Sequence, residues 1–523
     1  MKTSHGLFLV GCSALALAGC GPTDIASPGT GGNVNIVNNP APTPTPTPTP
    51  TSTLVTPAAG CPTIADPQGL DGTETITGPQ GTWRVCKLPS RINTSITLPK
   101  IAGLLYQLPG RVDVGTDAGF SSTSTGVTLT IEPGVIIYGN TGTSWLAVNR
   151  GNRINAVGTP TAPIIFTSRD NVLGLNTETS QGQWGGVVLM GRAPITDCQT
   201  GAVASGSTPS TCERQTEGAA DPANFGGANP ADNSGTMKYV QIRYSGFVLG
   251  ANSELQALTL EGVGSGTQLD YIQSYNSSDD GAEFFGGVVN MKHYIAVGAD
   301  DDSLDMDTGV QANLQYLLLI QRTGSGDALM ELDSNGNEAQ TPRQVSRIAN
   351  FTAVQTATSS NNEANAQAAL LFRGNSDISL YNGVVVTPAN ECIRLNGSGG
   401  TANRTTLLAR SVVMSCNSTK YLGTGTASSG GYTAADVATL FGSGQNGNND
   451  AYTSTLTGGF INGANETAVT PFDVTTLSSF FSAVTYIGAV KDSNDTWYAG
   501  WTCNSGAANF GSTSGSCLAL PTT

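Results

Sequence analysis

Charged residues and histidines are scarce in this sequence. Of its 523 residues, 12% are charged and two are histidines. His5 lies in an N-terminal segment that we expect to be cleaved, so His293 alone would remain. This scarcity excludes zinc sites that need two or three histidines, and a Ser–His–Asp triad would have to use His293. His293 stands in a strand-like run, where we expect a packed or solvent-facing role.

Residues that favour helices are also few. With 66 glycines and abundant Ser, Thr and Asn, the composition favours strands and turns. No P-loop pattern occurs, because the glycine-rich stretch 262–266 lacks the Lys-Ser/Thr end. The net charge of −15 at pH 7 argues against nucleic acid as a partner, since phosphates would be repelled. The same charge suits cations, basic partners or neutral glycans, and it is also what solubility alone would require.

The first residues predict an export signal. Lys2 precedes a short apolar run over residues 7–18, too short to span a membrane as a stable helix. The run ends in Leu17-Ala18-Gly19-Cys20, which resembles the bacterial lipobox. The resemblance implies a signal peptide over residues 1–19 and lipid, including palmitate-type acyl chains, on Cys20. Gly21, in place of an aspartate, favours the outer membrane over inner-membrane retention.

Residues 20–60 are predicted to form a tether. Pro and Thr alternate strictly over residues 42–50, which favours polyproline II and cannot pack a core. At about 3.1 Å per residue, such a tether would hold the domain a few nanometres from the membrane, on its periplasmic face or at the cell surface.

Eight of the ten cysteines would remain in the domain once Cys12 is cleaved off and Cys20 is lipidated. An even number in an exported chain indicates disulfides, and no C-x-x-C pair supports a thiolate metal site. The eight fall into local couples, and we predict the bonds Cys61–Cys86, Cys198–Cys212, Cys392–Cys416 and Cys503–Cys517.

Residues 61–523 are predicted to form one all-β domain. Short apolar runs recur between turn residues, for example at 127–131, 186–190 and 238–242. Segment 276–284 repeats as 298–306, with Asp280 aligned to Asp302 and Glu283 to Asp305 at a spacing of 22. A period of this size with short strands and polar turns predicts a β-solenoid, in which each coil stacks on the next. Residues 192–235 fit the coils poorly and predict a disulfide-clipped insert.

Several segments resemble known proteins. The sequence LTIEPGV at 129–135 is similar to the first coil of many right-handed parallel β-helix proteins. A longer series resembles a family of Gram-negative outer-membrane lipoproteins that includes a leptospiral member and is often encoded beside TonB-dependent receptors. That series comprises GQWGGVVLMG at 182–191, residues 239–244, 277–287 and 298–307, YIGAV at 486–490 and WYAGWT at 497–502. The resemblance implies a single-stranded right-handed parallel β-helix at the outer membrane, with nutrient capture beside a TonB-dependent receptor as a further implication.

The densest charge in the chain is acidic. If the coils stack at one period, these carboxylates form a ladder with about 4.8 Å between coils. Such a ladder could bind Ca²⁺, could supply an acid–base pair for glycan cleavage, or could cap turns through side chain–backbone hydrogen bonds. Asp327, Glu331 and Asp333 would extend it by one coil. The candidate metal ligands are Asp279, Asp280, Glu283, Asp300, Asp301, Asp302, Asp305 and Asp307.

Three functions remain open on the sequence alone. The first is a noncatalytic, surface-tethered binding protein for a ligand, glycan or partner such as a TonB-dependent receptor. The second is a polysaccharide lyase or hydrolase using the acidic ladder, with Arg243, Lys292 or Arg322 as the basic residue that a lyase needs. The third is an adhesin. A ladder that is filled by Ca²⁺ or caps turns would favour binding, and two isolated carboxylates with shifted pKa values in a cleft would favour hydrolysis. A flat face without a cleft would favour adhesion or assembly.

Overall fold

The computed structural model describes residues 54–121, 125–219, 221–250, 253–334, 336–359, 368–397 and 399–522. These residues belong to one compact unit, Leu54–Thr523. The predicted signal peptide, the lipidation site Cys20 and the Pro/Thr run of the tether lie outside the described residues. Among the described helices, none has the length and apolar character needed to cross a membrane.

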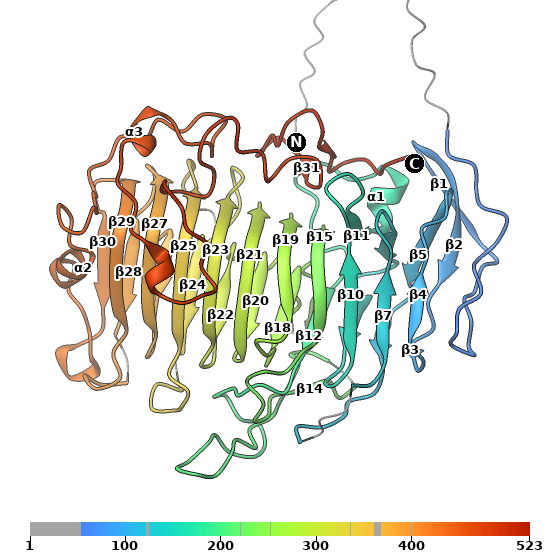
Figure 1. The fold of residues 1–523 in the computed structure, drawn as a ribbon, viewed down its shortest axis with the longest axis horizontal. Coiled ribbons are helices and arrows are strands. Elements are labelled where there is room, and N and C mark those ends of the chain that lie inside the picture. The colour runs from blue at the N-terminus through green and yellow to red at the C-terminus, as the bar shows by residue number, and fades with distance from the viewer. Residues whose placement is uncertain are drawn as a thin grey trace, which may run out of the picture. The chain divides into compact units, whose positions relative to one another are not determined.

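Two large, mostly parallel sheets form the body of the unit, and their strands are stacked side by side in Figure 1. The larger sheet follows the order β1 (Thr75–Gly78), β2 (Gly81–Lys87), β5 (Leu104–Leu108), β8 (Ile136–Gly139), β11 (Ile164–Ser168), β15 (Gly235–Arg243), β19 (Gln268–Tyr275), β21 (Val288–Val297), β23 (Gln311–Ile320), β25 (Val345–Val354), β27 (Asp377–Thr387) and β29 (Thr406–Cys416), with β4 (Ile96–Leu98), β7 (Thr128–Ile131) and β10 (Arg153–Val157) beside it.

The second sheet follows the order β3 (Arg91–Ile92), β6 (Arg111–Val114), β9 (Trp145–Val148), β12 (Gly186–Met190), β18 (Leu258–Glu261), β20 (Ala282–Phe285), β22 (Asp305–Asp307), β24 (Met330–Asp333), β26 (Leu370–Phe372), β28 (Ile393–Asn396) and β30 (Tyr421–Thr424). The chain alternates between the two sheets: each coil adds one strand to the second sheet, and one long strand or, in the early coils, two short strands to the larger sheet. Glu283 pairs with Asp305 in register, as the spacing of 22 predicts. This architecture confirms the predicted parallel β-helix.

The long strands of the larger sheet bend at a residue with positive φ. In the early coils, β10 and β11 are separate strands, and both pair with the single strand β15. The connection between β10 and β11 is replaced in β15 by Tyr239, at φ 53°. The same bend recurs coil after coil and forms a row of residues, which we call the corner row: Tyr239, Tyr271, His293, Tyr316, Asn350, Asn382 and Ser411.

The interior of the coils is apolar. Alternate residues of each strand point inward, so Phe284, Met306 and Leu332 stack on successive coils in complete burial. The residues between them in the sequence point outward. This alternation places Glu283, Asp305 and Glu331 on the outer surface of the second sheet.

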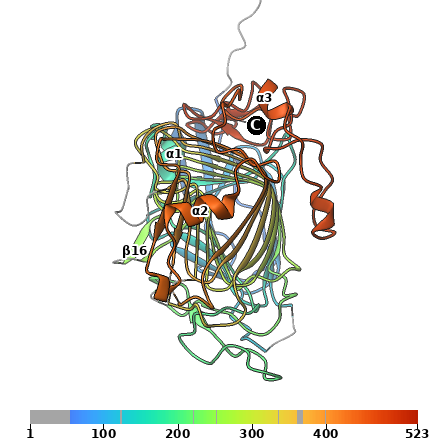
Figure 2. The same cartoon turned by 90° about the vertical axis from the view of Figure 1, so that its left-hand side faces the viewer.

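Both ends of the stack are closed. At the C-terminal end, α2 (Ala434–Phe441) lies across the last coils in Figure 2 and buries Val437 and Phe441. Thr433 and Asp436 form a capping box at the start of this helix. At the N-terminal end, β1 pairs with β2 in the antiparallel sense, which stops the parallel stacking.

Residues 450–522, which we call the C-terminal strap, run back across the coils (Figure 1). The strap contains α3 (Ala464–Thr467), the 3-10 turn η2 (Val474–Thr476), β31 (Cys503–Asn504) and β32 (Gly515–Ser516). Its contacts proceed from the last coils to the early ones. Asn382 bonds both the amide and the carbonyl of Phe472, Gln315 does so with Ser482, and Gln273 does so with Cys503.

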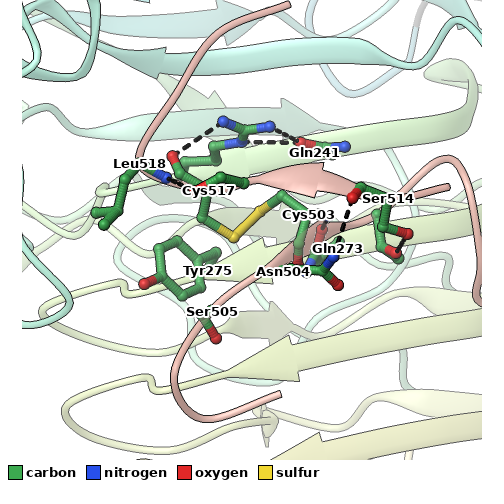
Figure 3. Close-up of a disulfide and its surroundings, with 12 residues drawn as sticks. Gln241, Gln273, Tyr275, Cys503, Asn504, Ser505, Ser514, Cys517 and Leu518 are labelled. Carbon is green, nitrogen blue, oxygen red and sulfur yellow. Dashed lines mark hydrogen bonds between the residues drawn. A yellow bond between two sulfur atoms is a disulfide. The ribbon is translucent and has the colours of Figure 1, made fainter. Parts of the chain in front are cut away.

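The four disulfides join the predicted pairs, Cys61–Cys86, Cys198–Cys212, Cys392–Cys416 and Cys503–Cys517. Figure 3 shows the last of them beside Gln241 and Gln273, where the end of the strap crosses the coils. Tyr244 and Arg243 both donate hydrogen bonds to the carbonyl of Cys517, at 3.0 Å. Buried polar groups of the coils therefore hold the disulfide-closed end of the strap.

The connection from β12 to β15 is long and lies outside the coils. It carries the disulfide Cys198–Cys212 and two short paired strands, β13 (Arg214–Gln215) and β14 (Asn224–Phe225). Phe225 packs near Trp145 and Phe285 on the outer face of the second sheet. Smaller elements are α1 (Arg169–Leu173), β16 (Val248–Gly250), β17 (Ser253–Glu254) and η1 (Ala427–Ser429).

Candidate metal centre

An acidic cavity of about 290 Å³ opens on the outer surface of the second sheet; we call it the acidic cleft. Strands β20, β22 and β24 and the turns before them supply most of its wall. The lining residues are Glu217, Glu254, Gln256, Asp279, Asp280, Glu283, Asp301, Asp302, Asp305, Asp327, Glu331 and Arg373. The cleft therefore gathers ten carboxylates and one guanidinium.

Strand register builds one wall of the cleft. Glu283, Asp305 and Glu331 are direct partners on three successive coils. Neighbouring parallel strands lie about 4.8 Å apart, so these side chains stand as a ladder of like charges. The structure confirms that Asp327, Glu331 and Asp333 extend the predicted ladder by one coil, with Asp333 in register with Asp307.

The turns before these strands supply the other wall, and two of their aspartates cap the next coil. Asp280 accepts a hydrogen bond from the backbone amide of Asp302 at 2.9 Å. Asp302 in turn accepts one from the amide of Ala328 at 2.7 Å. Turn capping is thus a real role of the repeated aspartates, and it uses only one carboxylate oxygen of each.

Two groups of three carboxylates are close enough to share an ion. In the first, single oxygens of Asp279, Asp280 and Asp301 lie within 4.8 Å of one another. In the second, the same holds for Asp280, Glu283 and Asp305. Hard oxygen ligands in this number and spacing suit Ca²⁺, whose coordination is flexible.

Glu283 is the least supported carboxylate of the cleft. It is 7% exposed, and none of the described residues gives it a hydrogen bond or an ion pair. Burial and the neighbouring Asp305 and Asp307 raise its pKa well above the usual value. A buried carboxylate without a donor is costly unless it is protonated or bound to a cation.

The other carboxyls are perturbed in the same direction. Burial, followed by repulsion from Asp301, raises the pKa of Asp279 to about 7. Burial, followed by repulsion from Asp333, raises the pKa of Asp305 to about 7. Burial together with neighbouring carboxylates also holds the pKa values of Asp280 and Asp302 well above their usual range.

Few groups offset this negative charge. Of the described residues that line the cleft, Arg373 alone is basic, and it pairs with Glu331 and, at 3.1 Å, with Asp333. Gln256 donates to Asp279 at 2.9 Å. Neither triad has a basic residue among its members.

The insert covers a further buried acid beside the cleft. Glu261, on β18, is 1% exposed and accepts a hydrogen bond from Thr216 of the insert at 2.6 Å. Burial raises its pKa to about 8. Glu217, one residue further along the insert, reaches the cleft itself.

Two of the predicted ligands do not line the cleft. Asp300 points away from its neighbours, toward Gln181 at 2.6 Å and Ser325. Asp307 stands in the adjacent register column, beside Asp333. Asp279, Asp280, Glu283, Asp301, Asp302 and Asp305 are brought together as expected.

The basic residues considered for a lyase lie elsewhere. Arg243 is buried under the strap and donates to the carbonyls of Cys517 and Ala519. Lys292 donates to Ser482 of the strap at 2.8 Å, and Arg322 bonds Gln181. None of the three lines the cleft.

His293 is a packed residue of the corner row. Its ring stacks between Tyr271 and Tyr316, with ring centroids 4.1 and 4.6 Å away. Its Nδ1 lies 2.7 Å from Asp270. Nothing in this arrangement resembles a Ser–His–Asp triad.

Sequence reasoning missed four lining residues, Glu217, Glu254, Gln256 and Arg373. A signal for Gln256 was present. Leu258 pairs with Ala282, so the same offset of 24 aligns Gln256 with Asp280. Glu217 comes from the insert, which has no register with the coils and gives no such signal.

Comparison with protein families agrees with the coil architecture. The profile described as a pectate-lyase like beta helix domain matches residues 114–502, which is more than half of the chain and includes every residue that lines the acidic cleft. Comparisons with curated proteins and with solved structures found no match. The chain therefore belongs to the family of pectate-lyase like beta helix domains.

Proposed function

We propose that this protein is a noncatalytic, extracytoplasmic binding protein whose acidic cleft takes up Ca²⁺. The observation that carries the proposal is Glu283, a buried carboxylate that faces the cavity with no donor among the described residues. A divalent cation would neutralise it together with Asp280 and Asp305, which lie within 4.8 Å. Flexible coordination by several carboxylates favours Ca²⁺ over Mg²⁺, which demands near-octahedral geometry.

We also propose that the protein is held at the outer membrane by lipid on Cys20. The lipobox-like tetrad, the Pro/Thr run and four disulfides support an exported, tethered domain. A TonB-dependent receptor or a glycan remains the proposed partner. Substitution Cys20→Ser should release the protein from the membrane fraction, and retention of the variant would contradict the anchor.

Calorimetric titration of Ca²⁺ into the EDTA-treated protein tests the proposed function. We expect binding and a higher melting temperature in Ca²⁺. The matched control is Asp221→Asn, because Asp221 is an exposed acid outside the cleft. No heat and no thermal shift in the wild-type protein would refute the proposed function.

Glycan hydrolysis is the second candidate. Asp279 and Asp305, with pKa values near 7, are suited to donate or accept a proton at neutral pH. Glu283 and Asp305 lie within 4.8 Å, close to the separation of about 5–5.5 Å found in retaining glycosidases. A lyase is less favoured, because Arg373 is already paired with two carboxylates. New reducing ends from a panel of neutral glycans, lost in Asp305→Asn, would support hydrolysis instead of simple binding.

A further inference from the structure

We propose that the acidic cleft holds two divalent cations bridged by the carboxylate of Asp280. This inference rests on the proposed function, because it concerns the number of ions in the same cleft. Asp280 is the one residue common to the two carboxylate triads. Asp301 belongs only to the first triad and Glu283 only to the second.

The first position is formed by two turns on successive coils. Asp279 and Asp301 face each other there, and Gln256 fixes Asp279 by donating to one of its oxygens at 2.9 Å. The backbone amide of Asp280 is a second donor to Asp279, so two donors fix this carboxylate on the wall of the cleft. Oxygens of Asp279 and Asp301 lie within 4.8 Å of each other, and their repulsion contributes to the raised pKa of Asp279.

The second position is formed by two strands in register. Glu283 on β20 and Asp305 on β22 are direct partners. One oxygen of Asp305 accepts the amide of Met306 at 2.6 Å, which leaves its second oxygen for a cation. Glu283 has both oxygens without a donor among the described residues, and it is more than nine-tenths buried.

Asp280 is built to bridge these positions. It is 5% exposed, and one of its oxygens is fixed by the amide of Asp302. In each triad, one oxygen of Asp280 lies within 4.8 Å of an oxygen of both other members. The donor that fixes the Asp280 carboxylate is a backbone amide of the next coil and not another side chain.

The charge of the cleft agrees with two ions. The two triads comprise five different carboxylates, or five negative charges when ionised. One divalent cation would leave three charges uncompensated, and two would leave one. Arg373 pairs with Glu331 and Asp333 and also favours the charged form of Asp305, so it offsets only part of the remaining charge.

Stoichiometry tests the pair directly. The whole protein would be stripped with EDTA and titrated with Ca²⁺, with bound ions counted by calorimetry and by native mass spectrometry. We expect two equivalents for the wild-type protein and for the control Asp221→Asn. Asp301→Asn and Glu283→Gln should each bind one equivalent, because each removes a ligand of one position only.

Asp280→Asn should weaken both positions. An asparagine keeps an oxygen that can accept the amide of Asp302, so the turn is expected to persist. Loss of the bridge should lower the affinity at both positions by about 10- to 100-fold or more. Circular dichroism and a melting curve in EDTA would show that each variant is folded.

Manganese supplies a readout that a structural role cannot mimic. Two Mn²⁺ ions bridged by one carboxylate should give an exchange-coupled paramagnetic resonance spectrum, which Asp301→Asn and Glu283→Gln should convert to that of an isolated ion. One equivalent of Ca²⁺ in the wild-type protein would overturn the pair and leave the proposed function standing. No binding of Ca²⁺ at all would overturn both.

Discussion

The buried charge of Glu283 destabilises the folded apo protein, and the same charge is what the proposed Ca²⁺ site requires. Its neighbours Phe284 and Ala282 are inside the core, so the strand fixes its position on the cleft wall. We expect Glu283→Gln to raise the melting temperature in EDTA by about 2 °C or more, because it removes a repelled charge worth about 1 kcal/mol or more. In Ca²⁺ the variant should gain less than the wild-type protein.

The matched control for this variant is Glu338→Gln, since Glu338 is half-buried and does not line the cleft. Its melting temperature should change little in either condition. A lower melting temperature for Glu283→Gln in EDTA would mean that the charge of Glu283 is stabilising, contrary to the burial seen here.

The raised pKa values of Asp279 and Asp305 predict a pH dependence of the apo protein. Their folded-state pKa values of about 7 exceed the usual value of 3.8, so the folded state binds the proton more tightly. The resulting stabilisation is complete below pH 4 and is lost as the pH rises through about 7. The melting temperature in EDTA should therefore fall between pH 5 and pH 8, and Ca²⁺ should reduce that fall. A flat profile in EDTA would contradict the shifts.

Most residues of the cleft could be predicted from the sequence, because residues one coil apart in the sequence become neighbours when the strands pair in register. The offset of 22 placed Glu283 beside Asp305, and the next coil followed from the same logic. The prediction that Asp300 is a ligand was wrong, because adjacent turn residues point to different sides and the sequence spacing does not determine which side. Glu217 was not predictable, since the insert reaches the cleft by tertiary packing alone.

At the scale of elements, the corner row turns each long strand. Tyr and His rings occupy its first four positions, although such residues rarely adopt positive φ. Tyr239, Tyr271, His293 and Tyr316 stack on one another at 4.1 to 4.6 Å between ring centroids. Stacking and the strap offset the backbone strain, so propensity could not reveal these bends in the sequence.

Asn382 allows the strain and the strap contacts of the corner row to be separated. Its φ is 52°, it is fully buried, and its side chain bonds both backbone groups of Phe472. Asn382→Val should cost about 3 kcal/mol or more, because a β-branched residue is strained there and both bonds are lost. Asn382→Gly should cost less, because glycine keeps the bend and loses only the bonds.

Urea unfolding of both variants would give these differences. Equal losses for the two substitutions would mean that the strap bonds, not the backbone conformation, determine the stability of this corner. If neither variant lowers the free energy of unfolding, neighbouring coils alone hold the bend.

At the scale of the whole molecule, a solenoid must protect two ends and one long flank. The antiparallel strand β1 and helix α2 close the ends, and both devices follow from simple rules about exposed strand edges. The flank is different. The strap covers it through contacts between residues more than 100 positions apart, such as Asn350 with Tyr486 and Gln241 with Trp501. No periodic pattern in the sequence encodes these contacts, so only the architecture reveals them.

Because the strap and the acidic cleft lie on different parts of the solenoid, we predict that the strap can loosen while the cleft still binds Ca²⁺. The bond Cys503–Cys517 closes a loop with a sequence separation of 14 at the end of the strap, and its removal should cost about 3 kcal/mol locally. The described residues that line the cleft include none from the strap. The double variant Cys503→Ser/Cys517→Ser should therefore be cleaved faster by protease within residues 500–522, while its Ca²⁺ stoichiometry stays that of the wild-type protein.

The double variant Cys198→Ser/Cys212→Ser is the complementary control, because that bond lies in the insert that supplies Glu217 to the cleft. It should alter Ca²⁺ affinity and leave the strap intact. Weaker Ca²⁺ binding after loss of Cys503–Cys517 would show that the strap and the cleft are coupled through the coils, and that the two flanks of the solenoid do not act independently.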